Sequence, residues 1–212
     1  MIPGPDLVLA CPHCSVPARL PTIESADGAS AVSWTDGCQE VPGIPRQPNV
    51  ARCHACRKFF WVGQAQQLGW LAPGLELPPE HEGWRTAPIV EALNADGYHE
   101  ALAAGIAEMP EQELELRVFA WWRDNDRFRK DGVPERFASD ERAVKNMERL
   151  IELCADGDHE ILLFRAEALR QLGRFDEAGE ALYGLCSDYA LARDKVSELI
   201  AAKSRDIAVL FS

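Results

Sequence analysis

Two pairs of cysteines constrain this chain more than any other feature. Each pair has the spacing Cys-x-x-Cys: Cys11 with Cys14, and Cys53 with Cys56. A turn of this length directs two thiolates at one metal ion, and two such turns complete a tetrahedral site with no open position. One pair alone would also suit thiol redox chemistry, whereas two pairs favour a metal. The sequence therefore predicts one structural Zn²⁺ ion per chain, bound by these four cysteines.

Other thiols and imidazoles are expected to stay off the metal. The chain has seven cysteines, and an odd total fits a metal site plus free thiols better than a disulfide framework. Cys154 and Cys186 lie in apolar helical patterns and are expected to be small core residues. Cys38 lies in a turn-like stretch and has no predicted role. His13 and His54 lie inside the pairs, but four thiolates already fill a tetrahedron.

The residues that flank both pairs are typical of short β-strands. Residues 7–10 lead into the first pair, 50–52 lead into the second, and 59–62 leave it. With these strands, roughly the first third of the chain resembles a zinc ribbon, in which two metal knuckles sit at the ends of short β-hairpins. The resemblance implies the metal rather than a function, because ribbons serve many purposes.

Proline content marks the end of this region. Residues 73–88 contain four prolines and read as a linker, after which the apolar period becomes helical. We therefore expect a mainly α protein: a small β zinc ribbon at 1–72, a Pro-rich linker at 73–88, and an all-α helical-hairpin domain at 89–212. The combination resembles uncharacterised bacterial proteins with an N-terminal zinc ribbon before a helical region, and this resemblance implies no activity.

The helical part divides at capping and breaking residues. Thr86 can cap a first helix and Asp96-Gly97 can end it, while Pro110 and Asp140 can begin later helices. The expected helices cover about 86–95, 98–107, 110–131, 140–154 and 188–203.

Residues 159–190 resemble one tetratricopeptide-type helical hairpin. The matching residues, in chain order, are Ala166, Leu169, Gly173, Phe175 and Ala178. Gly173 is expected to turn the chain between helices at about 160–172 and 176–186. Leu185 replaces the small residue usual late in the second helix, and there is no second clean copy, so the resemblance implies a single hairpin rather than a long array.

One helical segment is unusually rich in tryptophan and arginine. Its candidate interaction surface, able to grip a peptide or an acidic ligand, comprises Trp121, Trp122, Arg123, Arg127 and Arg129. The alternative is that the tryptophans belong to the core and the arginines pair with aspartates at i,i+3. We favour this alternative because such pairs are common on helices.

Charge argues against several classes of partner. The formal net charge is −12, and the first 70 residues contain five acidic and five basic residues, so the excess negative charge lies beyond them. An acidic body repels phosphate backbones, which makes nucleic acid an unlikely partner. No apolar run approaches the ~20 residues of a membrane span, and the start lacks a signal-peptide pattern, so a cytoplasmic protein is expected.

No catalytic residues emerge from the sequence. There is no Gly-rich phosphate loop, nucleophile elbow or open metal site. The leading hypothesis is a zinc-binding adaptor or regulatory module that binds another protein or peptide and is not an enzyme. The alternatives are a nucleic-acid-binding protein that acts through the ribbon and a thiol redox enzyme.

Overall fold

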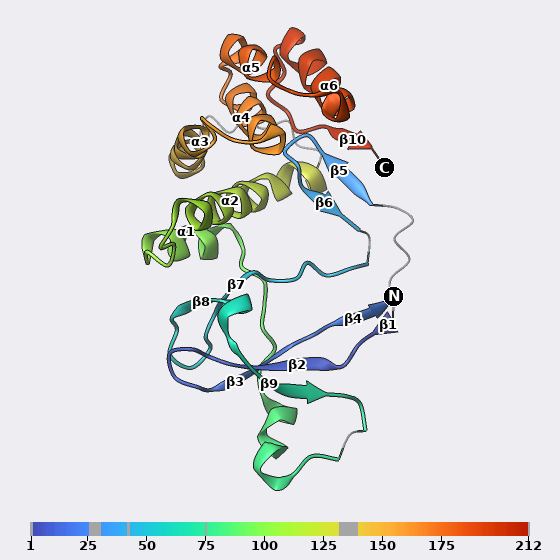
Figure 1. Ribbon diagram of the computed structural model, residues 1–212, viewed down its shortest axis with the longest axis vertical. Helices are drawn as coiled ribbons and strands as arrows, with labels where there is room; N and C mark the ends of the chain where they lie inside the picture. The colour runs from blue at the N-terminus through green and yellow to red at the C-terminus, as the bar shows by residue number, and fades with distance from the viewer. Residues whose placement is uncertain (1, 26–30, 42, 75, 132–139, 212) are drawn as a thin grey trace. The chain divides into compact units, whose positions relative to one another are not determined.

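The chain forms two compact units, each made of two separate stretches of sequence. The computed structural model describes residues 2–25, 31–41, 43–74, 76–131 and 140–211 (Figure 1). The first unit comprises Met1–Ser30 and Val41–Leu93, and the second comprises Ala31–Glu40 and Asn94–Ser212. In this division Ala31–Glu40, which lies between the two cysteine pairs in sequence, belongs to the helical unit, and the Pro-rich segment belongs to the β-rich unit.

The first unit is built from small antiparallel sheets. Its strands are β1 (Ile2–Pro3) with β4 (Ile23–Ser25), β2 (Asp6–Ala10) between β3 (Pro17–Leu20) and β9 (Gln66–Leu71), and β7 (Val50–Arg52) with β8 (Phe59–Trp61). A short 3-10 helix, η1 (Val62–Gln64), follows β8. Both faces of β2 are covered: Leu9 packs in a cluster with Phe60, and Val8 in a cluster with Leu71. The apolar β2 strand is thus the centre of this unit.

The Pro-rich segment packs on the β-rich unit. It contains a 3-10 helix, η2 (Pro79–Thr86), whose Trp84 is buried against Val8 and Leu71. A Cβ atom at Gly69 would lie 2.9 Å from the Trp84 ring, so the glycine lets the ring approach β9.

The expected helix at about 86–95 is wrong. The Arg19 N–H donates to the Pro88 carbonyl at 2.8 Å, and the Val90 N–H donates to the Arg19 carbonyl at 2.7 Å. Ala87, which precedes the proline, has an extended backbone, as proline favours. Residues 88–90 therefore pair with β3 instead of forming a helical turn.

The second unit begins its helices at capping residues. α1 (Ala95–Ala103) starts at Asn94, whose side chain accepts a hydrogen bond from the Gly97 N–H at 2.9 Å. Asp96-Gly97 therefore lies in the first turn of a helix and does not end one, which corrects the expected helix at 98–107. α2 (Pro110–Asp131) and α3 (Glu141–Leu153) begin where predicted, and Asp140 caps α3. The expected boundary residues Gly132 and Ser139 lie outside the described residues.

A helical hairpin follows where the sequence indicated, although its second helix ends at Leu182 and not near 186 as expected. α4 (His159–Gln171) and α5 (Phe175–Leu182) pack together, followed by η4 (Ser187–Tyr189) and α6 (Ala190–Ala201). Gly173 has φ of +82°, and the Gly173 and Arg174 N–H groups donate to the Arg170 and Leu169 carbonyls at 2.9 Å. This is a Schellman motif, the helix ending that requires a left-handed residue.

The second unit is not all-α. A three-stranded antiparallel sheet places β5 (Val32–Trp34) between β10 (Val209–Phe211) and β6 (Gln39–Glu40). The chain between the two cysteine pairs thus pairs with the C-terminal segment. Because this pairing is far apart in sequence, no local pattern indicated it.

Alanine substitutions at two glycines of the hairpin should change the free energy of unfolding in opposite directions. Gly173→Ala should lower the free energy of unfolding by roughly 1 kcal/mol, because a Cβ atom disfavours the left-handed backbone. Gly179→Ala should raise it by roughly 0.5–1 kcal/mol, because Gly179 lies inside α5 and nothing outside its own helix lies within 4 Å of where its Cβ atom would be. Urea unfolding of both variants measures the difference, and equal effects would contradict the hairpin geometry.

Candidate metal centre

The four paired cysteines converge on one point in the first unit. Their Sγ atoms all lie within 4.8 Å of one another. The Sγ–Sγ distance is 3.8 Å between Cys11 and Cys56 and 3.6 Å between Cys14 and Cys53. A tetrahedron with metal–sulfur bonds of about 2.3 Å has edges of about 3.8 Å. The donor set and its spacing therefore fit a single four-thiolate metal ion.

The two cysteine turns have the same backbone geometry. Each lies at the end of a hairpin, the first between β2 and β3 and the second between β7 and β8. In each turn the N–H of the first cysteine donates to the carbonyl five residues later, from Cys11 to Val16 and from Cys53 to Lys58. The residue four positions after the cysteine donates back to the cysteine carbonyl, from Ser15 to Cys11 and from Arg57 to Cys53, and all four distances are 2.8–3.0 Å. Ser15 and Arg57 both adopt the left-handed backbone, with φ of 59° and 62°. This repetition means that two equivalent knuckles present the thiols.

The thiols of the cluster differ in pKa. Burial raises the pKa of the Cys11 thiol to about 12. Burial also raises the pKa of Cys53, but the backbone N–H groups of Cys56 and Ala55 outweigh it, and the pKa falls to about 7. Four thiolates this close repel one another, so they ionise together only when a cation is present. Metal binding at this cluster therefore releases protons.

The two histidines within the knuckles do not belong to the cysteine cluster. A His13 ring nitrogen, Nε2, lies 3.0 Å from the Phe59 carbonyl oxygen, which links the first knuckle to the strand that leaves the second. His54 is exposed, and the ligand cluster contains only the four cysteines among the described residues. Arg52 lies across the second knuckle: its Nε donates to the Arg57 carbonyl at 3.1 Å, and its guanidinium is 5.0 Å from the centre of the Phe59 ring.

The remaining cysteines lie in the helical unit. Cys154 is fully buried in the main helical core, and burial raises its pKa to about 12, which keeps the thiol protonated. Cys186 is partly buried. Cys38 is also buried, and its backbone N–H donates to Asp36 at 3.1 Å.

The tryptophan- and arginine-rich segment does not form one accessible surface. Trp121 is 1% exposed and its Nε1 donates to Gln171 at 2.8 Å. The Arg129 side chain is also 1% exposed, and Arg123 pairs with Asp126 at 3.2 Å in the i,i+3 arrangement. Trp122 is partly buried, and Arg127 alone of the five candidate residues is exposed.

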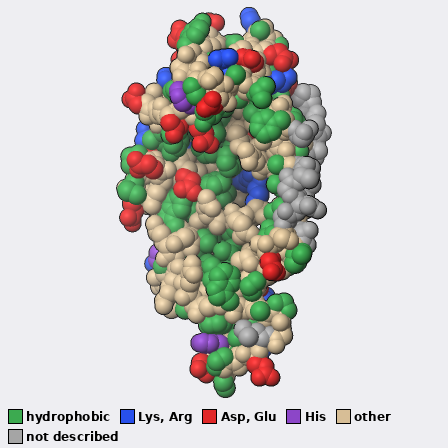
Figure 2. Space-filling model, turned by 45° about the vertical axis from the view of Figure 1, so that its right-hand side comes forward, with side chains coloured by type: hydrophobic (Ala, Val, Ile, Leu, Met, Phe, Trp, Pro, Cys, Tyr) green, Lys and Arg blue, Asp and Glu red, His purple; other side chains and the backbone are tan. Residues whose placement is uncertain are grey.

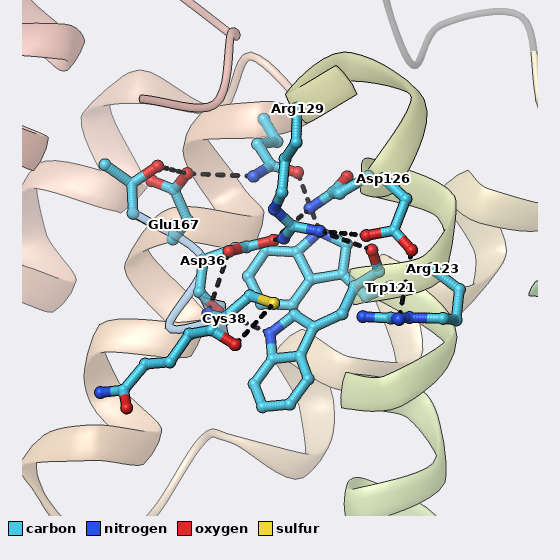
Figure 3. Close-up of polar contacts among 12 residues, drawn as sticks. Asp36, Cys38, Trp121, Arg123, Asp126, Arg129 and Glu167 are labelled. Carbon is cyan, nitrogen blue, oxygen red and sulfur yellow. Dashed lines mark hydrogen bonds and ion pairs between the residues drawn. The ribbon is translucent and has the colours of Figure 1, made fainter. Parts of the chain in front are cut away.

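Asp36 is the buried centre to which this segment is bound (Figure 3). Its carboxylate pairs with Arg129 and accepts a hydrogen bond from Asn125 at 2.7 Å. Its carbonyl accepts from Trp122 Nε1 at 2.9 Å. Arg129 lies between Asp36 and Asp126. It donates a hydrogen bond to Asp126 at 2.8 Å. Sequence reasoning missed Asp36 because Asp-Gly is read as a turn signal, which conceals a buried ion pair.

A second buried carboxylate extends this network. Glu167 accepts hydrogen bonds from Thr35 at 2.7 Å and from Arg170 Nε at 2.8 Å. Arg170, which is fully buried, also donates to the carbonyls of Ser204 and Asp206 at 2.5 and 2.8 Å. The segment before β10 and the β5–β6 hairpin are therefore held to α4 by the same group of charges.

Replacing Asp36 by asparagine should change how stability depends on pH. Burial raises the pKa of Asp36 from 3.8 to about 6, although Arg129 and Asn125 lower it. Folding thus takes up a proton between these values, and this group's contribution to stability falls as pH rises from about 4 to about 6. Relative to Asp36→Asn, the wild type should lose roughly 2 kcal/mol between pH 4 and pH 7. Urea unfolding of both proteins checks this, and a relative gain with rising pH would show that the Arg129 pair outweighs burial.

Comparison of the chain with protein-family models, curated proteins and solved structures finds no significant match in any of the three. Among the described residues, no helix is both long and apolar enough to cross a membrane. Function must therefore be argued from the chain's own residues.

Proposed function

We propose that the four cysteines bind one structural Zn²⁺ ion and that the chain is a cytoplasmic protein–protein interaction module without catalytic activity. The cluster of four thiols within 4.8 Å of one another carries this proposal. Zinc favours four thiolates in tetrahedral sites, and such sites are structural because no coordination position is left for a substrate. Zinc bound there would join the two knuckles and stabilise the β-rich unit as a zinc ribbon.

The helical unit supplies the proposed binding surface. A groove of about 470 Å³ lies between α5 and α6, where Leu182 and Ile200 supply apolar surface and Arg193 adds a cation. Tyr183, at its edge, is 90% exposed. An amphipathic peptide helix can place its apolar face in such a groove. The proposed partner is therefore another protein or a peptide.

Two alternatives are less well supported. Nucleic-acid binding through the ribbon would depend on Arg52, Arg57 and Lys58 in a chain with net charge −12. Thiol redox chemistry requires a thiolate that is free to attack, whereas a thiolate in a closed zinc site is bound to the metal.

Metal analysis tests the proposed zinc site. Freshly purified protein should contain about one zinc per chain by native mass spectrometry, and Cys53→Ser should lose it and unfold the β-rich unit. Structural zinc contributes roughly 10–16 kcal/mol of apparent binding free energy in small fingers. Cys186→Ser, outside the cluster, should keep its zinc. Zinc-free wild type prepared without chelator, or full zinc in Cys53→Ser, would refute the site.

Nucleic-acid titration separates the interaction module from its first alternative. Mixed-sequence DNA or RNA should show no measurable binding at about 50 mM salt, where proteins with several phosphate contacts bind tightly. The double variant Arg57→Ala with Lys58→Ala should behave identically in fluorescence anisotropy. A micromolar complex that weakens with added salt, and weakens again in the double variant, would favour the ribbon as a nucleic-acid-binding site.

A further inference from the structure

The helical unit contains a cleft that is rich in basic side chains. The cleft, about 790 Å³, lies among α1, α2 and α3. Five of its lining residues are basic: Arg117, Arg127, Arg142, Lys145 and Arg149. His99 and Asn146 also line it, against two acidic residues, Asp140 and Glu141. A concentration of cations is unexpected in a region of the chain that carries its whole excess of negative charge.

Two of the arginines share one carboxylate. Arg117 and Arg149 both donate to Glu113, at 2.8 and 3.0 Å. Hydrogen bonds from Arg149 and Arg117 lower the pKa of Glu113 to about 2, so it stays ionised. Arg117 also donates to Asn146 at 3.2 Å, and the Asn146 amide donates back to the Arg117 carbonyl at 2.9 Å. One carboxylate thus orients two guanidinium groups, while Arg149 reaches an exposed Glu152 as well.

The other three cations are free to change partners. Arg142 pairs with Asp96 and Lys145 with Glu141, both at 2.7 Å, but all four side chains are about half exposed or more. Exposed pairs of this kind are worth at most about 1 kcal/mol, so an entering anion can replace the carboxylate. Arg127 is exposed, stacks 4.8 Å from the Phe128 ring, and has no ion-pair partner among the residues that the structure describes.

The His99 side chain adds a fixed polar group. Its Nε2 lies 3.0 Å from Asp124, and the two side chains are only 10% and 5% exposed. The Asp124 carboxylate accepts from Nε2–H and so fixes the ring orientation. Neither His99 nor Asp124 belongs to the proposed zinc site.

We propose that this cleft binds a small phosphate-bearing molecule. Arginine forks match phosphate oxygens in charge and geometry, and two of them are already oriented here by Glu113. The volume exceeds that of one phosphate group and suits a nucleotide-sized ligand. Carboxylates in the cleft and beside it, Glu141 in the lining and Asp96 and Glu152 paired with its arginines, disfavour a long polyanion such as DNA or RNA. Figure 2 shows acidic side chains at many points of the face it draws.

Titration of the full chain with pyrophosphate, AMP and adenosine tests the proposal. Both phosphate probes should bind saturably by calorimetry at about 50 mM salt, adenosine should not, and AMP against pyrophosphate separates a nucleotide site from an inorganic phosphate site. Arg127→Gln and Arg142→Gln should each weaken binding roughly five- to tenfold. Arg193→Gln and Lys195→Gln, on α6, remove partly exposed cations that do not line the cleft and should leave affinity unchanged. The imidazole ¹⁵N signals of His99 should shift on binding.

Several outcomes would overturn the proposal. These are no binding of either phosphate probe at about 10 mM, equal weakening by the α6 variants, or saturable binding that leaves the His99 signals in place. Binding of mixed RNA more tightly than of AMP would instead assign the cleft to a polyanion. None of these outcomes depends on the zinc content of the protein or on its peptide partners.

Discussion

The β-rich unit depends on bringing four thiols within 4.8 Å of one another. Thiolates this close repel one another, so a cation at their centre would stabilise the arrangement. Several features of the surrounding chain bring the thiols together. Two hairpins present equivalent turns, which Ser15 and Arg57 close in the left-handed backbone conformation. A hydrogen bond joins the His13 ring of the first turn to the Phe59 carbonyl after the second. The apolar contacts of Leu9 and Phe60 then cover one side of the cluster.

The helical unit depends on a buried charge for a different reason. Asp36 reaches it on a short hairpin that lies, in sequence, between the two cysteine pairs. A buried ion pair adds little net stability over apolar packing, but it strongly penalises structures in which one partner is unpaired. Asp36 with Arg129, and Glu167 with Arg170, therefore specify where the hairpin and the C-terminal strand lie. A truncation between residues 72 and 89 would remove the β5–β6 hairpin from the helical unit and leave Arg129 buried without Asp36.

Local patterns predicted the elements whose cause is local. Cys-x-x-Cys spacing indicated the cluster of four cysteines, Pro110 and Asp140 indicated where helices begin, and Gly173 indicated the hairpin turn. The expected helix at 86–95 failed because Pro88 and Val90 bond to Arg19, far away in sequence, and no propensity encodes that pairing. The all-α expectation failed similarly, since β5 pairs with β10 across most of the chain. The tryptophan- and arginine-rich segment shows the limit most clearly, because the same residues suit a surface or a core until Asp36 is placed beside them.

The net charge of the chain and the local charge of the cleft favour different ligands. The composition alone, with a net charge of −12, suggests a protein that repels anions, and that inference holds for ligands large enough to feel the whole surface. The local balance differs in the cleft among α1, α2 and α3, where five of the lining residues are basic and two are acidic. Such a cleft discriminates by size: a small anion reaches the guanidinium groups, whereas a polymer must also lie against the surrounding carboxylates. An acidic protein with a basic cleft is thus better suited to small phosphorylated molecules than a uniformly basic protein, which would bind nucleic acids first.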